Sequence, residues 1–421
     1  MLTPLEQRLV DHVRSGEVLD LAGDGPVDAA ATRSQGPDRT VSARVIRDVV
    51  LGRLVERPDP HGLRLRGARI AGRLDLENAT GPVAVELLDC LLDGGVNARD
   101  ADLPALVLRG CRAAHPSEPA IDVEGLRARA LGLELLEARA DCPRGAVVVD
   151  HAGIGLLSLA GASLVNRGGP ALSARGLRVE RDLFLAHWGD AGFRAVGGGD
   201  LVALDLRDAR VGGTFWFAPD GLAHASGEPA ARLAVAGLTH AGLPGVVAPE
   251  EWLRLLREAT PAYAAQPYQH LAAAHRAVGH DAQARRVLVA QRRDQLARGA
   301  LGRGERAWAR LTGLLLGHGY QPWRALLGLL AVLVVAVALA LALGGDGLAR
   351  TGTPQGPCPV VERVALGLDV GSPLLTTKPR CEPTGTASGQ VLGVAGWLLR
   401  LLAWGFATLF VAGFTGAVRK T

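Results

Sequence analysis

A short pattern of apolar and small residues recurs about every eleven residues through the middle of this 421-residue chain. In the stretch GLRLRGARIAGRLDLENAT, Leu63 and Leu65 alternate with arginines, Ala68 and Ile70 follow, and the pattern restarts at Leu74. An apolar residue at every second position predicts a very short strand with one buried face. This repeat constrains the fold most, because each unit can bury its apolar face only against its neighbours.

Two such units match one coil of a right-handed, pentapeptide-like parallel β-helix with about 21 residues per coil. We expect a mainly β fold with about six coils, extending over residues 59–246. Cys90 and Cys111 occupy the small-residue position and are expected in an aliphatic core. In the unit that begins at Leu133, the pattern assigns Leu135 to the buried face.

Residues 1–58 are predicted to form a helical cap over the first coil, which would otherwise expose unpaired strand edges. Thr3, Pro4 and Glu6 stand where a capping box and an N1 proline begin a helix. A second helix is expected over about 41–54.

Residues 321–421 are predicted to form a membrane domain with spans at about 323–344 and 396–418 and an extracytoplasmic loop at 345–395. The first apolar run, Ala325 to Leu343, has no charge and nearly the length of a bilayer core. The second run is broken only by Arg400, which this placement puts at an interface, although a functional intramembrane arginine is the alternative. The predicted interfacial anchors are Trp308, Tyr320, Trp323, Trp397, Arg400 and Trp404.

Residues 247–320 connect the β-helix to the membrane domain through a helical hairpin and a basic, interfacial segment. By the positive-inside rule, the basic residues before the first span place both termini and the β-helix in the cytoplasm. The same residues are expected to attract anionic lipid of the inner leaflet. This membrane-surface basic patch comprises Arg285, Arg286, Arg292, Arg293, Arg298, Arg303, Arg306 and Arg310.

Cys358 and Cys381 both fall in the loop that is expected outside, where a disulfide can persist. We therefore predict a bridge between them, with two unpaired thiols as the alternative. The loop also contains VERVALGLDVGSPLL, interpreted as an amphipathic helix on the outer face or as a re-entrant segment.

Motifs of catalysis, cofactor binding and metal binding are not found, so no catalytic, cofactor or metal residues are predicted. His270, His275 and His280 are interpreted as surface residues, because a spacing of five spreads them around a helix. Acidic residues of the repeat such as Asp75, Glu77 and Asp205 are expected to face solvent. The small net charge of +4 gives no support for nucleic-acid binding.

The chain as a whole resembles a family of membrane-anchored proteins of high-GC bacteria that combine a pentapeptide-like β-helix, a helical hairpin and two C-terminal spans. Members are often labelled "membrane-associated oxidoreductase", and the resemblance implies a location in the bacterial cell membrane. The label implies a redox activity, but no catalytic motif in this sequence matches it. The resembling stretches are LTPLEQRL, RTVSARVIRDVVL, GLRLRGARIAGRLDLENAT, AHRAVGHDAQARRVLVAQRR, GYQPWRALL and FVAGFTGAVRK.

The function predicted from this architecture is a non-enzymatic scaffold that presents a β-helix to an unknown cytoplasmic protein at the membrane. One alternative is a homo-oligomeric two-span ion channel, since two spans in one chain cannot enclose a pore. The second alternative is the labelled oxidoreductase. The glycine-rich insertion from Asp190 to Asp200, directly after Trp188, is the one local departure from the repeat, and its role is left open.

Overall fold

The protein is described by a computed structural model that divides into two compact units, Met1–Gln291 and Arg292–Thr421. The structure describes residues 2–23, 36–199, 202–225, 232–299, 302, 304, 323–351, 357–372 and 380–419.

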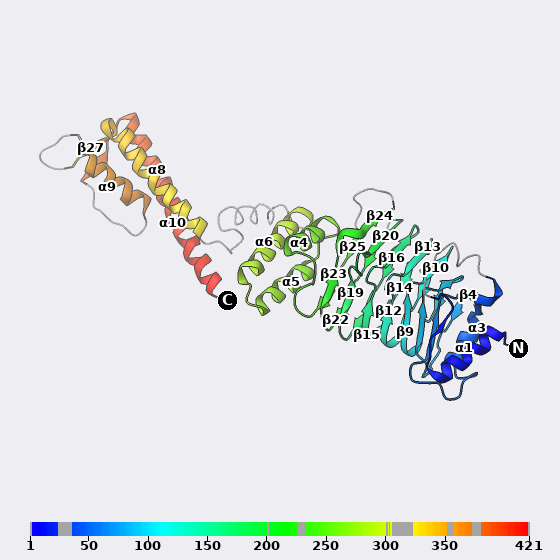
Figure 1. Cartoon of the computed structure of the whole chain (residues 1–421). Helices are drawn as coiled ribbons and strands as arrows, with labels where there is room; N and C mark the ends of the chain where they lie inside the picture. Colours follow the sequence, from blue (N-terminus) through cyan, green and yellow to red (C-terminus); the bar gives the residue numbers. More distant parts are fainter. Residues whose placement is uncertain are drawn as a thin grey trace. The chain divides into compact units, whose positions relative to one another are not determined.

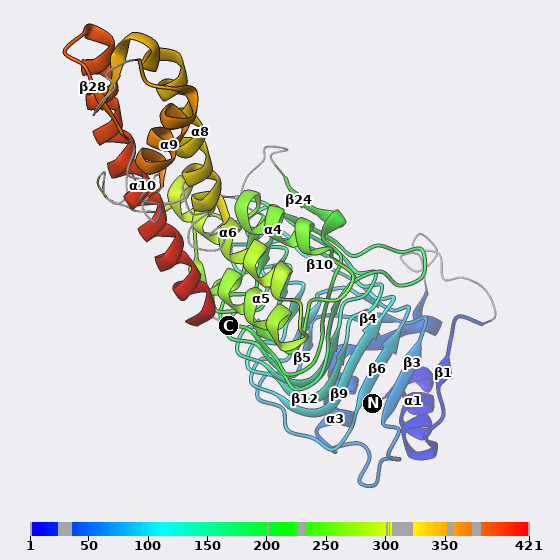
Figure 2. The same cartoon turned by 90° about the vertical axis from the view of Figure 1, so that its left-hand side faces the viewer.

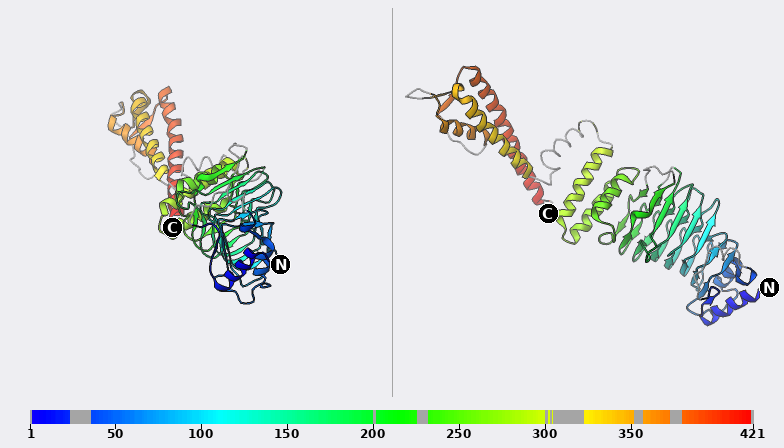
Figure 3. Two further views of the ribbon diagram at one scale, coloured as in Figure 1. Left: turned by 45° about the vertical axis from the view of Figure 1, so that its right-hand side comes forward. Right: turned by 45° about the horizontal axis from the view of Figure 1, so that its top comes forward.

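The first unit contains a parallel β-solenoid of about seven turns, as the repeat predicts (Figures 1 and 3). Its short strands stack into three parallel sheets, named A, B and C here, and Figure 2 shows the nested outline of the coils. The core lies inside the coils and is mostly aliphatic.

The strands of each sheet follow one another at one per coil. Sheet A contains β1 (Leu19–Asp20), β3 (Leu63–Arg66), β6 (Val85–Leu88), β9 (Asp102–Arg109), β12 (Arg127–Gly132), β15 (Gly153–Ser158), β18 (Arg178–Val179), β22 (Arg210–Val211) and β26 (Thr239–His240), with β19 (Leu183–Leu185) and β23 (Phe215–Phe217) beside them. Sheet B contains β2 (Thr40–Ser42), β4 (Arg69–Ala71), β7 (Leu91–Leu92), β10 (Arg112–His115), β13 (Glu137–Ala140), β16 (Ser163–Asn166), β20 (Arg194–Gly197) and β24 (Leu222–His224). Sheet C contains β5 (Leu74–Asp75), β8 (Val96–Asn97), β11 (Ile121–Asp122), β14 (Val147–Val148), β17 (Leu172–Ser173), β21 (Leu204–Asp205) and β25 (Leu233–Ala234).

The predicted coil length is close to the observed one in the first coils, where Leu63 pairs with Val85 and Val85 with Leu106. Each coil has three strands, however, and not the two that half-coil units suggested, and there are about seven coils rather than six.

The prediction for Leu135 is wrong. Register places Leu136, and not Leu135, in the core position that Cys111 and Cys90 hold in the preceding coils. Leu135 is only half-buried and adopts a left-handed backbone with φ of 54°. It occupies a corner between sheets A and B where neighbouring coils have Gly110 and Gly161.

A second left-handed corner recurs where each coil passes from sheet C to the next strand of sheet A. Glycine, asparagine and aspartate predominate there because they tolerate positive φ most easily. The corner is formed by Asn78, Asp100, Gly125, His151, Gly176, Asp208 and Gly237.

The N-terminal cap contains α1 (Pro4–Ser15) and α3 (Ala43–Val50), with a 3-10 turn at Pro37–Arg39. The predicted capping box is confirmed, since the Glu6 backbone N–H donates to Thr3 Oγ1 and the Thr3 N–H to Glu6 Oε2 at 2.8 Å. The second helix is shorter than predicted, because Val41 belongs to strand β2.

The other end of the solenoid is covered by helices α4 (Pro249–Glu258), α5 (Ala265–Ala277) and α6 (Asp281–Arg298), after a 3-10 turn at Pro219–Gly221. The α5–α6 hairpin is the one predicted from sequence, and Gly279 between them has φ of 78°. Trp252 of α4 closes the core with its ring edge-on to Phe215 and Phe217.

The second unit contains α8 (Trp323–Gly347), α9 (Val360–Gly371) and α10 (Ala387–Arg419), with a two-stranded pair formed by β27 (Leu348–Arg350) and β28 (Cys381–Pro383). Two described segments, Ala325–Gly347 and Ala387–Val411, are long and apolar enough to cross a membrane. Helix α10 begins nine residues before the span predicted at 396–418.

Candidate functional site

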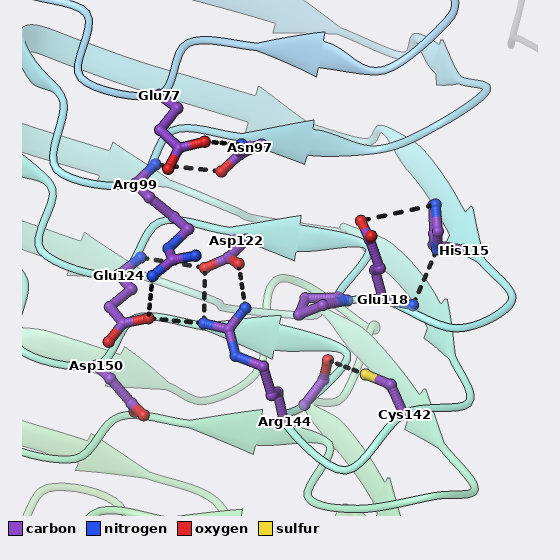
Figure 4. A network of polar contacts seen from close by, with 12 residues as sticks. Glu77, Asn97, Arg99, His115, Glu118, Asp122, Glu124, Cys142, Arg144 and Asp150 are labelled. Carbon is purple, nitrogen blue, oxygen red and sulfur yellow. Dashed lines mark hydrogen bonds and ion pairs between the residues drawn. The ribbon is translucent and has the colours of Figure 1, made fainter.

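Buried carboxylates line the outside of sheet C and pair with arginines from the loops around it (Figure 4). Asp122, Asp150 and Asp205 are at most 4% exposed. The shortest nitrogen–oxygen distances are 2.6 Å for Arg144–Asp122, 2.8 Å for Arg175–Asp150 and 2.6 Å for Arg207–Asp205. Each of these carboxylates is paired with an arginine. The pairs Arg144–Asp122 and Arg175–Asp150 join neighbouring coils and therefore stabilise the stack of coils.

The expectation that Asp205 faces solvent is wrong, because the Arg207 side chain covers it. Glu77 is exposed as expected, and Asp75 is half-buried between Arg47 and Asn97. Sequence periodicity gives the direction of such a side chain but not the arginine that covers it.

The histidines are not all at the surface. His275 of α5 is 2% exposed, and neither ring nitrogen has a hydrogen-bond partner among the described residues. His270 is half-buried, and its Nε2 lies 3.1 Å from both the backbone N and the backbone O of His240. Of these three histidines only His280 is exposed, as predicted. Burial, with a smaller contribution from His270, lowers the pKa of His240 to about 4.

Four arginines of the predicted basic patch lie on one exposed face of α6. Arg285 and Arg286 recur as Arg292 and Arg293 seven residues later, which is two helical turns. Arg298 does not belong to this face, because its Nε and one terminal nitrogen donate to the buried carboxylate of Asp294.

The remaining patch residues and several predicted anchors lie outside the described residues: Arg303, Arg306, Trp308, Arg310 and Tyr320, together with the side chain of Trp323. Trp397 and Trp404 are exposed on α10. Their role as membrane anchors stays a prediction.

The predicted cysteine pair is present, with the sulfur atoms of Cys358 and Cys381 2.10 Å apart. The bridge closes the segment that contains α9. Helix α9 packs along α8, since a Cβ placed on Gly367 would lie 2.6 Å from the Cα of Val337 and one on Gly371 2.8 Å from the Cα of Leu333. This packing favours the re-entrant interpretation over a helix on the outer face.

Arg400 of α10 donates to the Asp369 carboxylate of α9 at 2.7 Å. Helices α8 and α10 run antiparallel, with Gly347 next to Gly389 and Gly328 next to Phe406. Arg400 is therefore level with the middle of α8, and its role as an interfacial anchor stays a prediction. The ion pair borders a mostly apolar cavity of about 270 Å³ between α8, α9 and α10.

The segment predicted as an insertion contains strand β20, which pairs with β16 and β24 in sheet B, so part of it follows the repeat and does not depart from it. The Trp188 indole before it is exposed. The Arg109 guanidinium lies 5.5 Å from the centre of the Trp188 ring, a cation–π distance, and Trp188 forms a backbone bridge with Ala191. Asp200, at the end of the predicted insertion, lies outside the described residues.

Within the described residues, no group of three or more histidine, cysteine, aspartate or glutamate side chains is placed to hold a metal ion. No protein-family model, curated protein or solved structure matches the chain. The resemblance to membrane-associated oxidoreductases therefore stays a prediction.

Proposed function

We propose that the protein is a membrane-anchored scaffold that presents its β-solenoid to a protein partner. The observation that carries this proposal is one continuous core through about seven coils, cross-linked outside by ion pairs between neighbouring coils. Such a stack has little freedom to deform, so it holds side chains of successive coils at fixed spacing.

The proposed anchor consists of α8 and α10, with the arginine face of α6 against the anionic lipid of the cytoplasmic leaflet. In this arrangement both termini are cytoplasmic and the disulfide lies outside. The source of the protein would be a bacterium, as the resemblance implies.

Site-directed photo-crosslinking in cells tests the scaffold. A photoreactive residue is placed at one exposed position on each face: Glu180 beside sheet A, Arg139 on sheet B and Glu77 beside sheet C. The proposal predicts a discrete protein adduct from one face and none from the other two. The absence of an adduct from all three faces would contradict it.

A second candidate, an oligomeric channel, is favoured by one observation. Helix α9 returns alongside α8 and brings Asp369 to Arg400 level with the middle of α8. A half-length helix with an ion pair at that depth is compatible with the lining of a pore shared by several copies. Conductance of the purified full chain in planar bilayers tests this candidate.

A further inference from the structure

One outward-facing row on sheet A is rich in arginine. It crosses the solenoid at one residue per coil, so its members are about 4.8 Å apart along the stack. The backbone register fixes the row as Thr80, Asp102, Arg127, Gly153, Arg178, Arg210 and Thr239.

The arginines of this row differ from most others on the solenoid because they lack carboxylate partners. Arg127, Arg178 and Arg210, together with Arg129 two residues after Arg127, are exposed and have no ion pair in the part of the chain that the structure describes. Elsewhere arginines pair across coils: Arg64–Glu86, Arg66–Asp89, Arg69–Asp93 and Arg112–Glu137. Arg178 and Arg210 lie directly opposite each other on neighbouring strands. Two like charges in this position destabilise the pairing of the strands unless an anion is bound between them.

The row borders an open groove of about 830 Å³ that extends from Thr80 to Glu180. Glycines form its floor between the arginines: Gly153 has no atom within 4 Å of a Cβ placed on it, whereas a Cβ on Gly155 would lie 2.4 Å from the Arg129 carbonyl oxygen. The groove is therefore open because side chains are missing at these positions, and it runs along the axis of the stack.

We infer that this groove binds an acidic peptide segment of the scaffold's partner, an inference that rests on the proposed function. Five coils from Thr80 to Arg178 extend about 19 Å, which matches about six residues of extended peptide. Three arginines along this length supply charge-assisted hydrogen bonds to carboxylates.

The lining favours a peptide over a nucleic acid. Among the described residues no aromatic side chain lines the groove, so it offers no stacking platform for bases. Asp102 and Glu180 stand near its two ends. These carboxylates would repel a phosphate backbone and an acidic peptide alike, so the missing stacking platform carries the preference for a peptide.

The test uses the full-length chain in detergent and a fluorescein-labelled hexaglutamate peptide, with anisotropy as the readout. The double variant Arg127→Ala/Arg178→Ala should bind the peptide at least about tenfold more weakly, since each tenfold corresponds to about 1.4 kcal/mol. The matched control is Arg139→Ala/Arg194→Ala, which removes two exposed arginines of sheet B that also lack ion pairs among the described residues. It should stay within twofold of the unmodified chain.

A second pair of variants does not remove any arginine. Gly153→Glu places a carboxylate between Arg127 and Arg178 in open space and should abolish peptide binding, whereas Gly153→Gln should largely keep it. Circular dichroism would establish that all four variants are folded.

Equal losses in the sheet A and sheet B variants would overturn the inference, and so would unchanged binding by Gly153→Glu. Preferential binding of hexathymidylate at the same arginines would assign the groove to nucleic acid instead. If the peptide does not bind but crosslinking from sheet B or sheet C gives a partner, the groove inference fails and the scaffold stands. If crosslinking fails on every face, the scaffold fails whatever the peptide result.

Discussion

The guanidinium of Arg400 in α10 lies 2.7 Å from the carboxylate of Asp369 in α9. This ion pair connects α10 to α9, and α9 in turn packs through Gly367 and Gly371 onto α8. The pair therefore holds a helix enclosed by the Cys358–Cys381 bridge against the two long apolar helices.

Removing only one partner of this pair should be costly. Arg400→Gln removes the Arg400 cation from the Asp369 carboxylate, and because the Arg400 side chain is about half exposed the expected loss of stability is about 1 kcal/mol. The double variant Asp369→Asn/Arg400→Gln should recover most of that stability, because no unpaired charge remains. Thermal unfolding of the detergent-purified chain measures both, and equal losses in the single and double variants would contradict the pairing account.

Removal of the bridge should loosen the same region. Cys358 and Cys381 are 23 residues apart, and the chain-entropy model gives about 3 kcal/mol for a loop of this size. A Cys358→Ser/Cys381→Ser variant should therefore unfold at lower temperature in the second unit and should be indifferent to reductant. If reductant lowers the unfolding temperature of this variant as well, the effect does not come from the bridge.

Gly95, a left-handed glycine between sheets B and C, should not tolerate a Cβ. Gly95 has φ of 71°, and a Cβ there would lie 2.0 Å from the Ala120 carbonyl oxygen. Gly95→Ala should destabilise the first unit by at least about 2 kcal/mol in chemical unfolding. Gly52→Ala separates the cost of the positive φ from the cost of the steric clash, because Gly52 has nearly the same φ but open space around it. Its loss of stability should therefore be smaller.

The solenoid should become less stable at low pH because of a buried histidine at its end near α5. Burial, followed by the neighbouring His270, lowers the pKa of His240 to about 4 from an ordinary value of 6.5. Between these pH values the unfolded chain binds more protons than the folded one, so the free energy of unfolding falls as pH decreases, by about 3 kcal/mol in total.

His240→Leu removes this titrating group and should flatten the decline between pH 6.5 and pH 4. The exposed His280, changed to leucine in the same way, provides the control and should leave the profile unchanged. An equally steep decline in the His240 variant would assign the acid sensitivity to other groups.

The solenoid and its cap could be predicted from sequence because their signals are local. Period-two alternation gave the strands, and Thr3 with Glu6 gave the start of α1. Leu135 was misplaced because two adjacent leucines, Leu135 and Leu136, both fit the apolar position, and only pairing with the neighbouring coil selects between them.

The site could be predicted only in part because its contacts are long-range. The pairing of Cys358 with Cys381 followed from the number of cysteines in one loop. The contact between Arg400 and Asp369 joins residues 31 positions apart in different helices, and the groove on sheet A depends on the register of successive coils. Neither leaves a periodic signal in the sequence.

The mass of the full-length chain in detergent, by light scattering with the detergent contribution subtracted, tests the central claim most directly. The scaffold account predicts one or two copies, since two apolar helices per chain then suffice for an anchor but not for a pore. A ring of four or more copies would contradict the scaffold account and would favour the ion channel.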